Sequence, residues 1–388
     1  MKKVISFVIA LMLFCGTVWG MHIYSSKSMA LHNNSFSTWS NESKFNCKEA
    51  IVNNLNPHSL VVFGSSEFQH GSKTPYHPKN MFKGFEFNPM LIGAGYYQCL
   101  SHAITMASIA KDIPNQKAVL LISPSWFRKD GVKDKFFASR FSQSNYIGML
   151  ENTDITPKTK SYIINRTKKL LKVDKPTLKR INSYNSVLLE GNRDFWQNVD
   201  YKISRTFWAE KDRQDFAAQT ALAGLKSNQN KNVKDTPINW QDYMNQAQAD
   251  GEKYNTNPFY MAPKSYRFIS MDMDKKKDMN KGVKNGYAHS PEYGDLKCFL
   301  DVCKEQNIDI MLVALPVNGY WFDFKAFPGS ERKQYYNNIR NIAKEYNAPL
   351  VDLSNEEFTK YFFQDGVHLG GKGWVTVNEK LYDFYQKN

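Results

Sequence analysis

Short apolar runs recur along this chain, and segments with helical periodicity lie between them. Residues 59–64 (SLVVFG) and 118–123 (AVLLIS) are typical of buried strands, and residues 93–113 between them follow a helical period. Two further runs of this kind occur at 308–316 (IDIMLVALP) and 348–354 (APLVDLS). Alternating strands and helices predict an α/β fold built on a mainly parallel sheet.

Helical segments also lie at 296–306, 332–346 and 373–386, which completes the alternation in the C-terminal part. Residues from about 135 to 290 have helical segments and no convincing strand, so we interpret them as a helical insertion. A length of 388 residues fits one large domain with such an insertion. We therefore expect one α/β domain over 58–388.

The N-terminus carries an apolar run after Lys2 and Lys3 that is long enough to cross a membrane as a helix. No small-residue cleavage site follows this run, so we expect residues 1–24 to remain as a transmembrane anchor. Because the lysines precede the span, the positive-inside rule places the rest of the chain outside the cytoplasm. The prediction is a single-pass protein of the cell membrane with an extracytoplasmic C-terminal domain.

Residues 25–57 are polar and rich in serine and asparagine. We expect them to form a stalk and lead-in outside the core.

The formal net charge is +14, and lysine-rich runs at 158–180 and 274–284 supply much of it. Such runs usually form solvated helix faces, but they also attract polyanions or anionic lipid headgroups. On the outer side of a membrane we expect no nucleic-acid partner.

Five cysteines are scattered along the chain, and their spacing predicts no metal site. Cys15 lacks the small residues of a lipobox before it, and we expect it to be a membrane-buried thiol. Cys47 and Cys99 could form a bridge outside the cell, or remain buried free thiols with Cys298 and Cys303. The sequence leaves both outcomes open.

Ser65 and Ser66 stand at the end of the first strand, and Asp365 and His368 lie three residues apart near the C-terminus. A serine becomes a nucleophile when a base accepts its proton and a third group fixes the tautomer of that base. Because ligands of parallel sheets bind at the carboxyl ends of strands, these residues predict a Ser-His-Asp triad.

Other motifs carry less weight. His70 and His77 lie in a polar loop and His102 on a helix, so we expect structural or surface roles for them. Residues 370–373 lack the spacing of a phosphate loop, and residues 93–95 lack the third glycine of a dinucleotide fingerprint. We expect no nucleotide and no other cofactor.

Gly64-Ser65-Ser66-Glu67, together with residues 365–369, resembles the first and last blocks of the SGNH/GDSL hydrolase superfamily. More narrowly, the chain resembles the DltD family of D-alanyl-lipoteichoic acid biosynthesis proteins. That resemblance covers essentially the whole chain and includes the N-terminal anchor and residues 123–127, 257–259, 315–320 and 365–374. It implies a three-layer α/β/α fold.

The resemblance also assigns roles. It makes Ser66 the nucleophile, His368 the base and Asp365 the residue that orients it. A glycine would donate its N–H to the oxyanion, and of Gly93 and Gly95 we prefer Gly95.

Ser125 stands nearest the position where the superfamily has an asparagine. A hydroxyl has a shorter reach than a carboxamide, so the sequence does not identify the third oxyanion donor of this chain.

The activity implied is D-alanyl transfer to lipoteichoic acid in a Gram-positive envelope, through a D-alanyl-serine intermediate and with possible thioesterase activity. The implied partners are lipoteichoic acid, a membrane-bound O-acyltransferase and, less directly, the D-alanyl carrier protein. Two alternatives remain open: an O-acyl esterase or acetyltransferase of wall glycans, and a non-catalytic docking module for the D-alanylation machinery.

Overall fold

The computed structural model describes residues 2–31, 34–41, 44–191, 194–225, 235–284 and 286–387. Its centre is a five-stranded sheet in the order β2-β1-β3-β4-β5, with all neighbouring strands parallel. The strands are β1 (Ser59–Phe63), β2 (Asn88–Ile92), β3 (Lys117–Ile122), β4 (Asp309–Ala314) and β5 (Leu350–Asp352). The predicted α/β fold with a mainly parallel sheet is confirmed.

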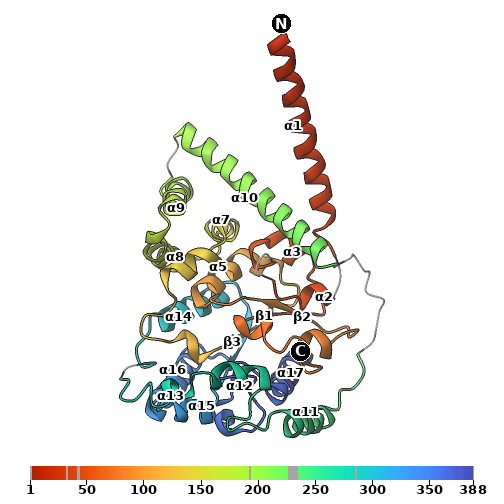
Figure 1. Ribbon diagram of the computed structural model, residues 1–388. Coiled ribbons are helices and arrows are strands. Elements are labelled where there is room, and N and C mark those ends of the chain that lie inside the picture. The colour runs from red at the N-terminus through yellow and green to blue at the C-terminus, as the bar shows by residue number, and fades with distance from the viewer. Residues whose placement is uncertain are drawn as a thin grey trace.

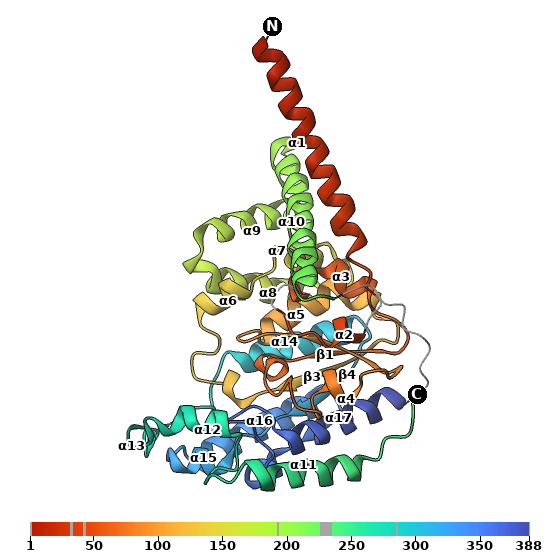
Figure 2. The ribbon, with the colours of Figure 1, turned by 45° about the vertical axis from the view of Figure 1, so that its right-hand side comes forward.

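Helices cover both faces of this sheet (Figure 2). Successive side chains of a strand point to opposite faces, so Val61 and Val62 belong to two different apolar clusters. The cluster on the Val61 side includes α5 (Cys99–Ile109) and α14 (Glu292–Glu305), and the Val62 side includes α17 (Gly371–Gln386). The chain therefore forms three layers, with α11 (Trp240–Tyr254) packed against α17.

The other helices lie before, within and after the expected insertion. They are α2 (Asn34–Ser37), α3 (Lys48–Asn53), α4 (Pro78–Met81), α6 (Asp134–Arg140), α7 (Gln143–Glu151), α8 (Pro157–Leu170), α9 (Lys175–Leu188), α10 (Phe195–Leu222), α12 (Pro263–Ser270), α13 (Met273–Lys276), α15 (Gly319–Phe324) and α16 (Gly329–Glu345). In the described part of 135–290, helices and loops follow one another without a strand. Residues 192, 193, 226–234 and 285 of this range lie outside the described residues.

The N-terminal helix α1 (Lys2–Lys27) projects away from the body (Figure 1). Among the described residues it is the one helix long and apolar enough to cross a membrane. Its apolar side chains, such as Val4 and Phe14, are exposed. Near its C-terminal end α1 contacts α10.

The segment 25–57 differs from the expected stalk. Met29, Phe36, Phe45 and Ile51 are buried and belong to the same apolar cluster as α5. The expectation that this segment lies outside the core was wrong, because a few apolar side chains suffice to bury it although polar residues surround them. Residues 32, 33, 42 and 43 lie outside the described part.

The cysteines are free thiols in this structure. Cys47 and Cys99 are both buried, and the Cys47 sulfur lies 3.6 Å from the sulfur of Met29. Burial raises the pKa of the Cys47 thiol to about 12. The sequence left open a bridge between Cys47 and Cys99 or buried free thiols, and the structure contains buried free thiols.

The lysine-rich run 158–180 is only partly a solvated face. Lys160 is buried and donates to the Leu150 carbonyl at 2.8 Å. Arg166 pairs with the buried Asp295 at 3.0 Å. The exposed cations of this run include Lys169 and Lys172.

We predict that Phe45→Ala lowers the free energy of unfolding by about 3–5 kcal/mol, because it removes a buried aromatic ring. This ring is 1% exposed, and its centroid lies 4.4 Å from that of Tyr97. Phe268→Ala is the matched control, because its ring is 70% exposed. The control should change the stability by less than about 0.5 kcal/mol. Urea unfolding of the full chain in detergent measures both. Equal midpoints for the two variants would contradict a structural role for the segment 25–57.

Candidate active site

The candidate site lies where the strand order reverses. The chain passes from β1 to β2 on one side of β1 and then returns to β3 on the other. In open parallel sheets, ligands bind outside the carboxyl ends of the strands at such a reversal. Ser65 and Ser66 follow Gly64 at this end of β1, and Ser66 begins the short 3₁₀ helix η2 (Ser66–Gln69).

The turn after β1 packs tightly against the end of β2. A Cβ atom on Gly93 would lie 2.0 Å from the Gly64 carbonyl oxygen, so only glycine fits there. The buried hydroxyl of Ser65 donates to the Ala94 carbonyl at 2.9 Å. Ser65 is thus held inward, as expected of a turn residue, and the next side chain, Ser66, is left partly exposed.

Asp365 and His368 lie in a tight loop directly before α17. One carboxylate oxygen, Oδ1 of Asp365, accepts the backbone N–H groups of Val367 at 2.9 Å and His368 at 3.0 Å. The N–H of Gln364 donates to the His368 carbonyl at 2.8 Å and closes the loop. The three-residue spacing therefore brings carboxylate and imidazole together through a side-chain turn rather than a helical turn.

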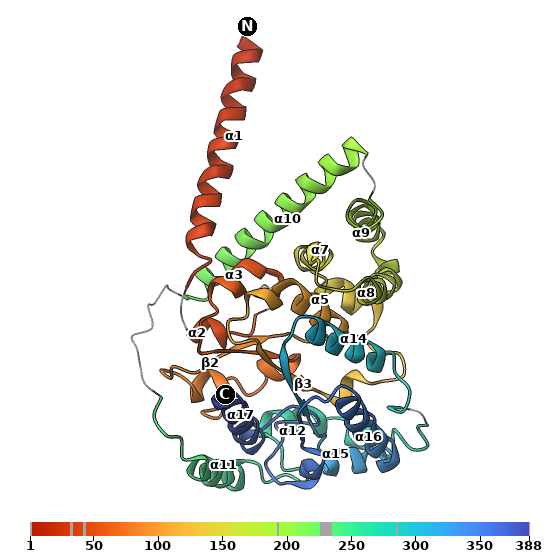
Figure 3. The same ribbon diagram turned by 180° about the vertical axis from the view of Figure 1, so that it is seen from behind.

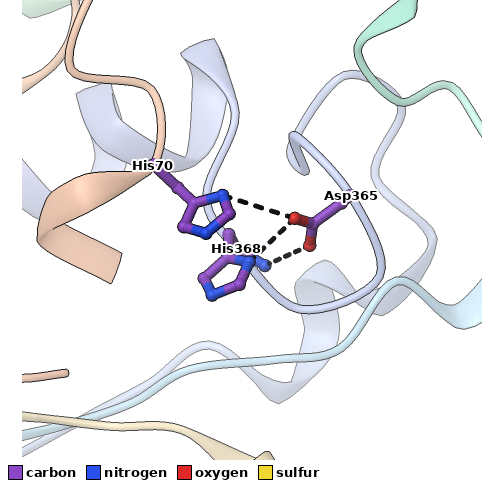
Figure 4. Close-up of side chains that lie close together, drawn as sticks. All are labelled: His70, Asp365 and His368. Atoms are coloured by element: carbon purple, nitrogen blue, oxygen red, sulfur yellow. Dashed lines mark hydrogen bonds and ion pairs between the residues drawn. The ribbon is translucent and has the colours of Figure 1, made fainter. Parts of the chain in front are cut away.

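The structure joins the three predicted side chains in one hydrogen-bonded chain. Ser66 Oγ lies 2.8 Å from His368 Nε2, and His368 Nδ1 lies 2.8 Å from Asp365 Oδ2. Figure 4 shows the carboxylate–imidazole part of this chain. With the proton on Nδ1 donated to Asp365, Nε2 is free to accept the proton of the serine hydroxyl.

Electrostatics favour the charge states that this chain requires. Burial of Asp365 opposes its ionisation, but hydrogen bonds from His368 and Val367 and the charge of His368 lower its pKa to about 2. Burial favours the neutral His368 ring, but the hydrogen bond and charge of Asp365 outweigh this effect and raise the pKa of His368. Asp365 therefore stays ionised at neutral pH, and the basicity of His368 is increased.

His70 lies at the site, although the sequence pattern suggested a role outside it. Its ring stacks on that of His368 with 3.6 Å between centroids and 4° between planes (Figure 4). Its Nδ1 lies 3.6 Å from Asp365 Oδ2. Burial and the neighbouring His368 charge lower the pKa of His70 to about 4, against the opposing effect of Asp365. A neutral ring thus covers one face of His368 and restricts its rotation.

The same three side chains are also close enough together to hold a metal ion. A cation would have to displace the proton that joins His368 to Asp365 and would remove the base from Ser66. The hydrogen-bonded arrangement and metal binding therefore exclude each other at this place.

The other two histidines have structural roles. His77 is buried, accepts the Lys79 N–H through Nδ1 and contacts the Phe68 carbonyl through Nε2 at 3.1 Å. His102 is buried and its Nε2 lies 2.9 Å from the Gly64 carbonyl, which supports the turn before Ser65. Neither is a base for Ser66.

The predicted oxyanion donors Gly95 and Ser125 follow β2 and β3, the two strands that pair with β1. Arg140 Nε donates to the Gly95 carbonyl at 2.9 Å and orients that loop. The Ser125 hydroxyl pairs with that of Ser123 at 2.9 Å, in the 3₁₀ helix η4 (Pro124–Trp126) after β3. Roles for Gly95 and Ser125 at an oxyanion remain predictions.

Glu67 is a buried acid that the sequence analysis did not single out. Its Oε2 accepts the Ser65 N–H at 2.7 Å, and its side chain is 2% exposed. Burial raises its pKa, although the nearby His368 charge and hydrogen bonds from Ser65 and Ser123 oppose the shift. Glu67 lies in η2, beyond the end of β1, and its burial there has no periodic signal in the sequence.

Comparison with known proteins relates the chain to one family. The family model described as DltD protein matches residues 33–386. Protein DltD of Bacillus subtilis (strain 168) is 29% identical over 335 residues, which cover 85% of this chain and 83% of that protein. Protein DltD of Staphylococcus aureus (strain NCTC 8325 / PS 47) is 24% identical over 329 residues, 82% of this chain and 79% of its own length. Protein DltD of Lacticaseibacillus rhamnosus is 23% identical over 354 residues, which cover 87% of this chain and 80% of that protein.

We predict that the rate of Ser66 labelling by a serine-reactive phosphonate falls as the pH drops through the pKa of His368. Only the neutral imidazole accepts the serine proton, and Asp365 raises the pKa of His368 above the ordinary 6.5. Asp365→Asn should therefore move the midpoint to lower pH and also slow labelling at high pH, because it favours the wrong tautomer.

His70→Phe is the control for this profile, since a phenyl ring preserves the stack without titrating. Because His70 already has a pKa of about 4, the variant should keep the wild-type midpoint. Intact-mass measurement over a pH series gives the rates. If His70→Phe shifts the midpoint and Asp365→Asn does not, His368 is not the base that activates Ser66.

Proposed function

Because the chain belongs to the DltD family, we propose that it is a Ser66-dependent acyltransferase that adds D-alanyl groups to lipoteichoic acid. The observation that carries the proposal is the Ser66–His368–Asp365 hydrogen-bonded chain at the end of β1. A serine, a base and an orienting carboxylate in this order suit acyl transfer through a covalent intermediate.

In the first step, Ser66 Oγ attacks the carbonyl carbon of an activated D-alanyl ester or thioester. His368 Nε2 takes the hydroxyl proton, and Asp365 stabilises the imidazolium that forms. Collapse of the tetrahedral intermediate breaks the bond to the leaving alcohol or thiol, which receives the proton from His368. The product of this step is a D-alanyl ester of Ser66.

In the second step, a hydroxyl of the polymer attacks the acyl-serine. His368 takes the proton of this hydroxyl and then returns a proton to Ser66 Oγ as the ester of the polymer forms. Water in place of the hydroxyl would give hydrolysis, a thioesterase side reaction. The stacked His70 and the loop bonds of Asp365 keep the base in place through both steps.

The negative charge of each tetrahedral intermediate requires hydrogen-bond donors. We assign this role to the N–H groups of Ser66 and Gly95. Ser125 is the candidate side chain, because it follows β3, the neighbour of β1 in the sheet.

The setting of the reaction follows from α1. We expect Lys2 and Lys3 to stay on the cytoplasmic side of a single span, with the α/β domain outside the cell. A membrane-bound O-acyltransferase would then supply D-alanyl groups, and the cytoplasmic D-alanyl carrier protein would act through it. The net charge of +14 suits a polyanionic acceptor.

We predict that Ser66→Ala abolishes D-alanyl ester formation on lipoteichoic acid, a loss on the order of 10⁴-fold in rate. Ser65→Ala is the matched control one residue away and should retain most of the activity, because its hydroxyl only bonds the Ala94 carbonyl. Ester content of lipoteichoic acid from complemented cells measures both, with circular dichroism as the check on folding. Full activity of the Ser66→Ala variant would contradict a catalytic role for Ser66 and would favour a non-catalytic docking role for the protein.

We predict that the body, from Lys27 onward, is outside the cell. Protease added to intact protoplasts should therefore digest it, whereas a cytoplasmic marker protein should survive. Digestion that requires lysis would overturn the orientation and with it the extracytoplasmic reaction.

A further inference from the structure

Helix α10 extends from the body on the same side as α1 (Figures 1 and 3). It has 28 residues and a length of about 42 Å. Its C-terminal part is anchored in the core through Phe216, whose ring centroid lies 5.4 Å from that of Phe36. Towards its N-terminus, α10 diverges from α1, so the two helices form a V that opens away from the body (Figures 1 and 3).

One face of this N-terminal part packs on α7 and α9, two other helices of the insertion. Tyr201 and Arg205 both bind the carboxylate of Glu151 on α7, and the Arg180 guanidinium lies 5.3 Å from the ring centroid of Trp208. These contacts fix the rotation of α10 about its axis.

The other face is apolar and uncovered. Trp196, Ile203 and Phe207 are spaced seven and four residues apart, which places them on one side of the helix. Their exposed fractions are 74%, 63% and 57%, and Phe195 beside them is 67% exposed. Asp200 interrupts this side of the helix between Trp196 and Ile203, whereas Ile203 and Phe207 are neighbours one turn apart. Large apolar side chains grouped on an exposed helix face mark an interaction surface rather than a solvated one.

The position of α1 identifies what covers this surface. A cavity of about 720 Å³ lies between the two helices, lined by Phe14 and Val18 of α1 and by Ile203 and Phe207 of α10. If α1 crosses the bilayer, Phe14 and Val18 lie in lipid, so the side chains opposite them lie at the same depth. At that depth Ile203 and Phe207 face lipid, next to the charged side chains that also line the cavity.

We propose that the stripe Trp196, Ile203 and Phe207, with Phe195 at the start of the helix, lies in the lipid interface as a second contact with the bilayer. Charged residues of both signs flank the stripe: Lys202, Glu210, Lys211 and Asp215 line the same cavity, and Lys211 pairs with Asp215. Lysine stems such as that of Lys202 can cover lipid while the ammonium group reaches the phosphates. Apolar residues on one face of a helix with charged residues beside them are typical of helices that contact a membrane surface.

The test uses the full chain in nanodiscs of phosphatidylglycerol and phosphatidylethanolamine, one chain per disc. Cys15→Ser removes the exposed thiol, and the remaining cysteines are buried. Ile203→Cys, Phe207→Cys and Phe268→Cys each receive a bimane label in this background. Phe268 is the matched control, an equally exposed aromatic residue on α12, remote from α1 in Figure 1.

We expect labels at 203 and 207 to be quenched by doxyl-labelled lipid and to lose quenching by aqueous iodide. The label at 268 should show the opposite pattern. Iodide quenching at all three positions would overturn the proposal. Shielding of 203 and 207 from both quenchers would overturn it too, because a protein surface rather than lipid would then cover the stripe.

Discussion

The carboxylate of Asp365 is the group on which the site depends most. Its Oδ1 holds the backbone of its own loop through the N–H groups of Val367 and His368, and its Oδ2 holds the imidazole. One side chain thereby fixes the path of the loop, the tautomer of His368 and the charge that raises its basicity. These hydrogen bonds also keep the group ionised although it is largely enclosed, because they are stronger to the charged form than to the neutral one.

The loop that carries this carboxylate is positioned by parts of the chain that are distant in sequence. The N–H of Asn318 donates to the Gly366 carbonyl at 3.0 Å, and the N–H of Ala262 donates to the Gln364 carbonyl at 3.0 Å. Asn318 also binds the Phe259 carbonyl through its side chain at 2.9 Å. The last segment of the helical insertion is thus part of the support of the site, and it links the loop to the end of β4.

Much of the fold could be predicted from the sequence, because buried parallel strands are short apolar runs and four of the five were recognisable. β2 was missed since Asn88-Pro89 at its start resembles a loop, and proline is tolerated there because β2 is an edge strand. Ser66, Asp365 and His368 were predictable because each lies just after a strand or before a helix. The parts played by His70 and Glu67 were not, since they depend on how η2 turns and on burial, neither of which has a periodic signal. The segment 25–57 was misjudged for a similar reason: its few apolar residues have no regular spacing.

The contacts between the end of α1 and the body determine how far Ser66 can move relative to the bilayer. His22 near the end of α1 lies 2.8 Å from Glu210 and 2.9 Å from Arg213, and Arg213 also binds Glu49 at 2.6 Å. Arg213 also pairs with Glu210 at 2.6 Å. Ion pairs near the surface are individually weak, but these three contacts around Arg213 resist a change of angle more than a flexible stalk would. For a chain anchored through α1, Ser66 then stays at a nearly constant height above the bilayer while the protein diffuses within it. Under the proposed function, a long polymer acceptor would have to bend to that height. The stiffness of the polymer, rather than the length of a tether, would then decide which of its repeats reach Ser66.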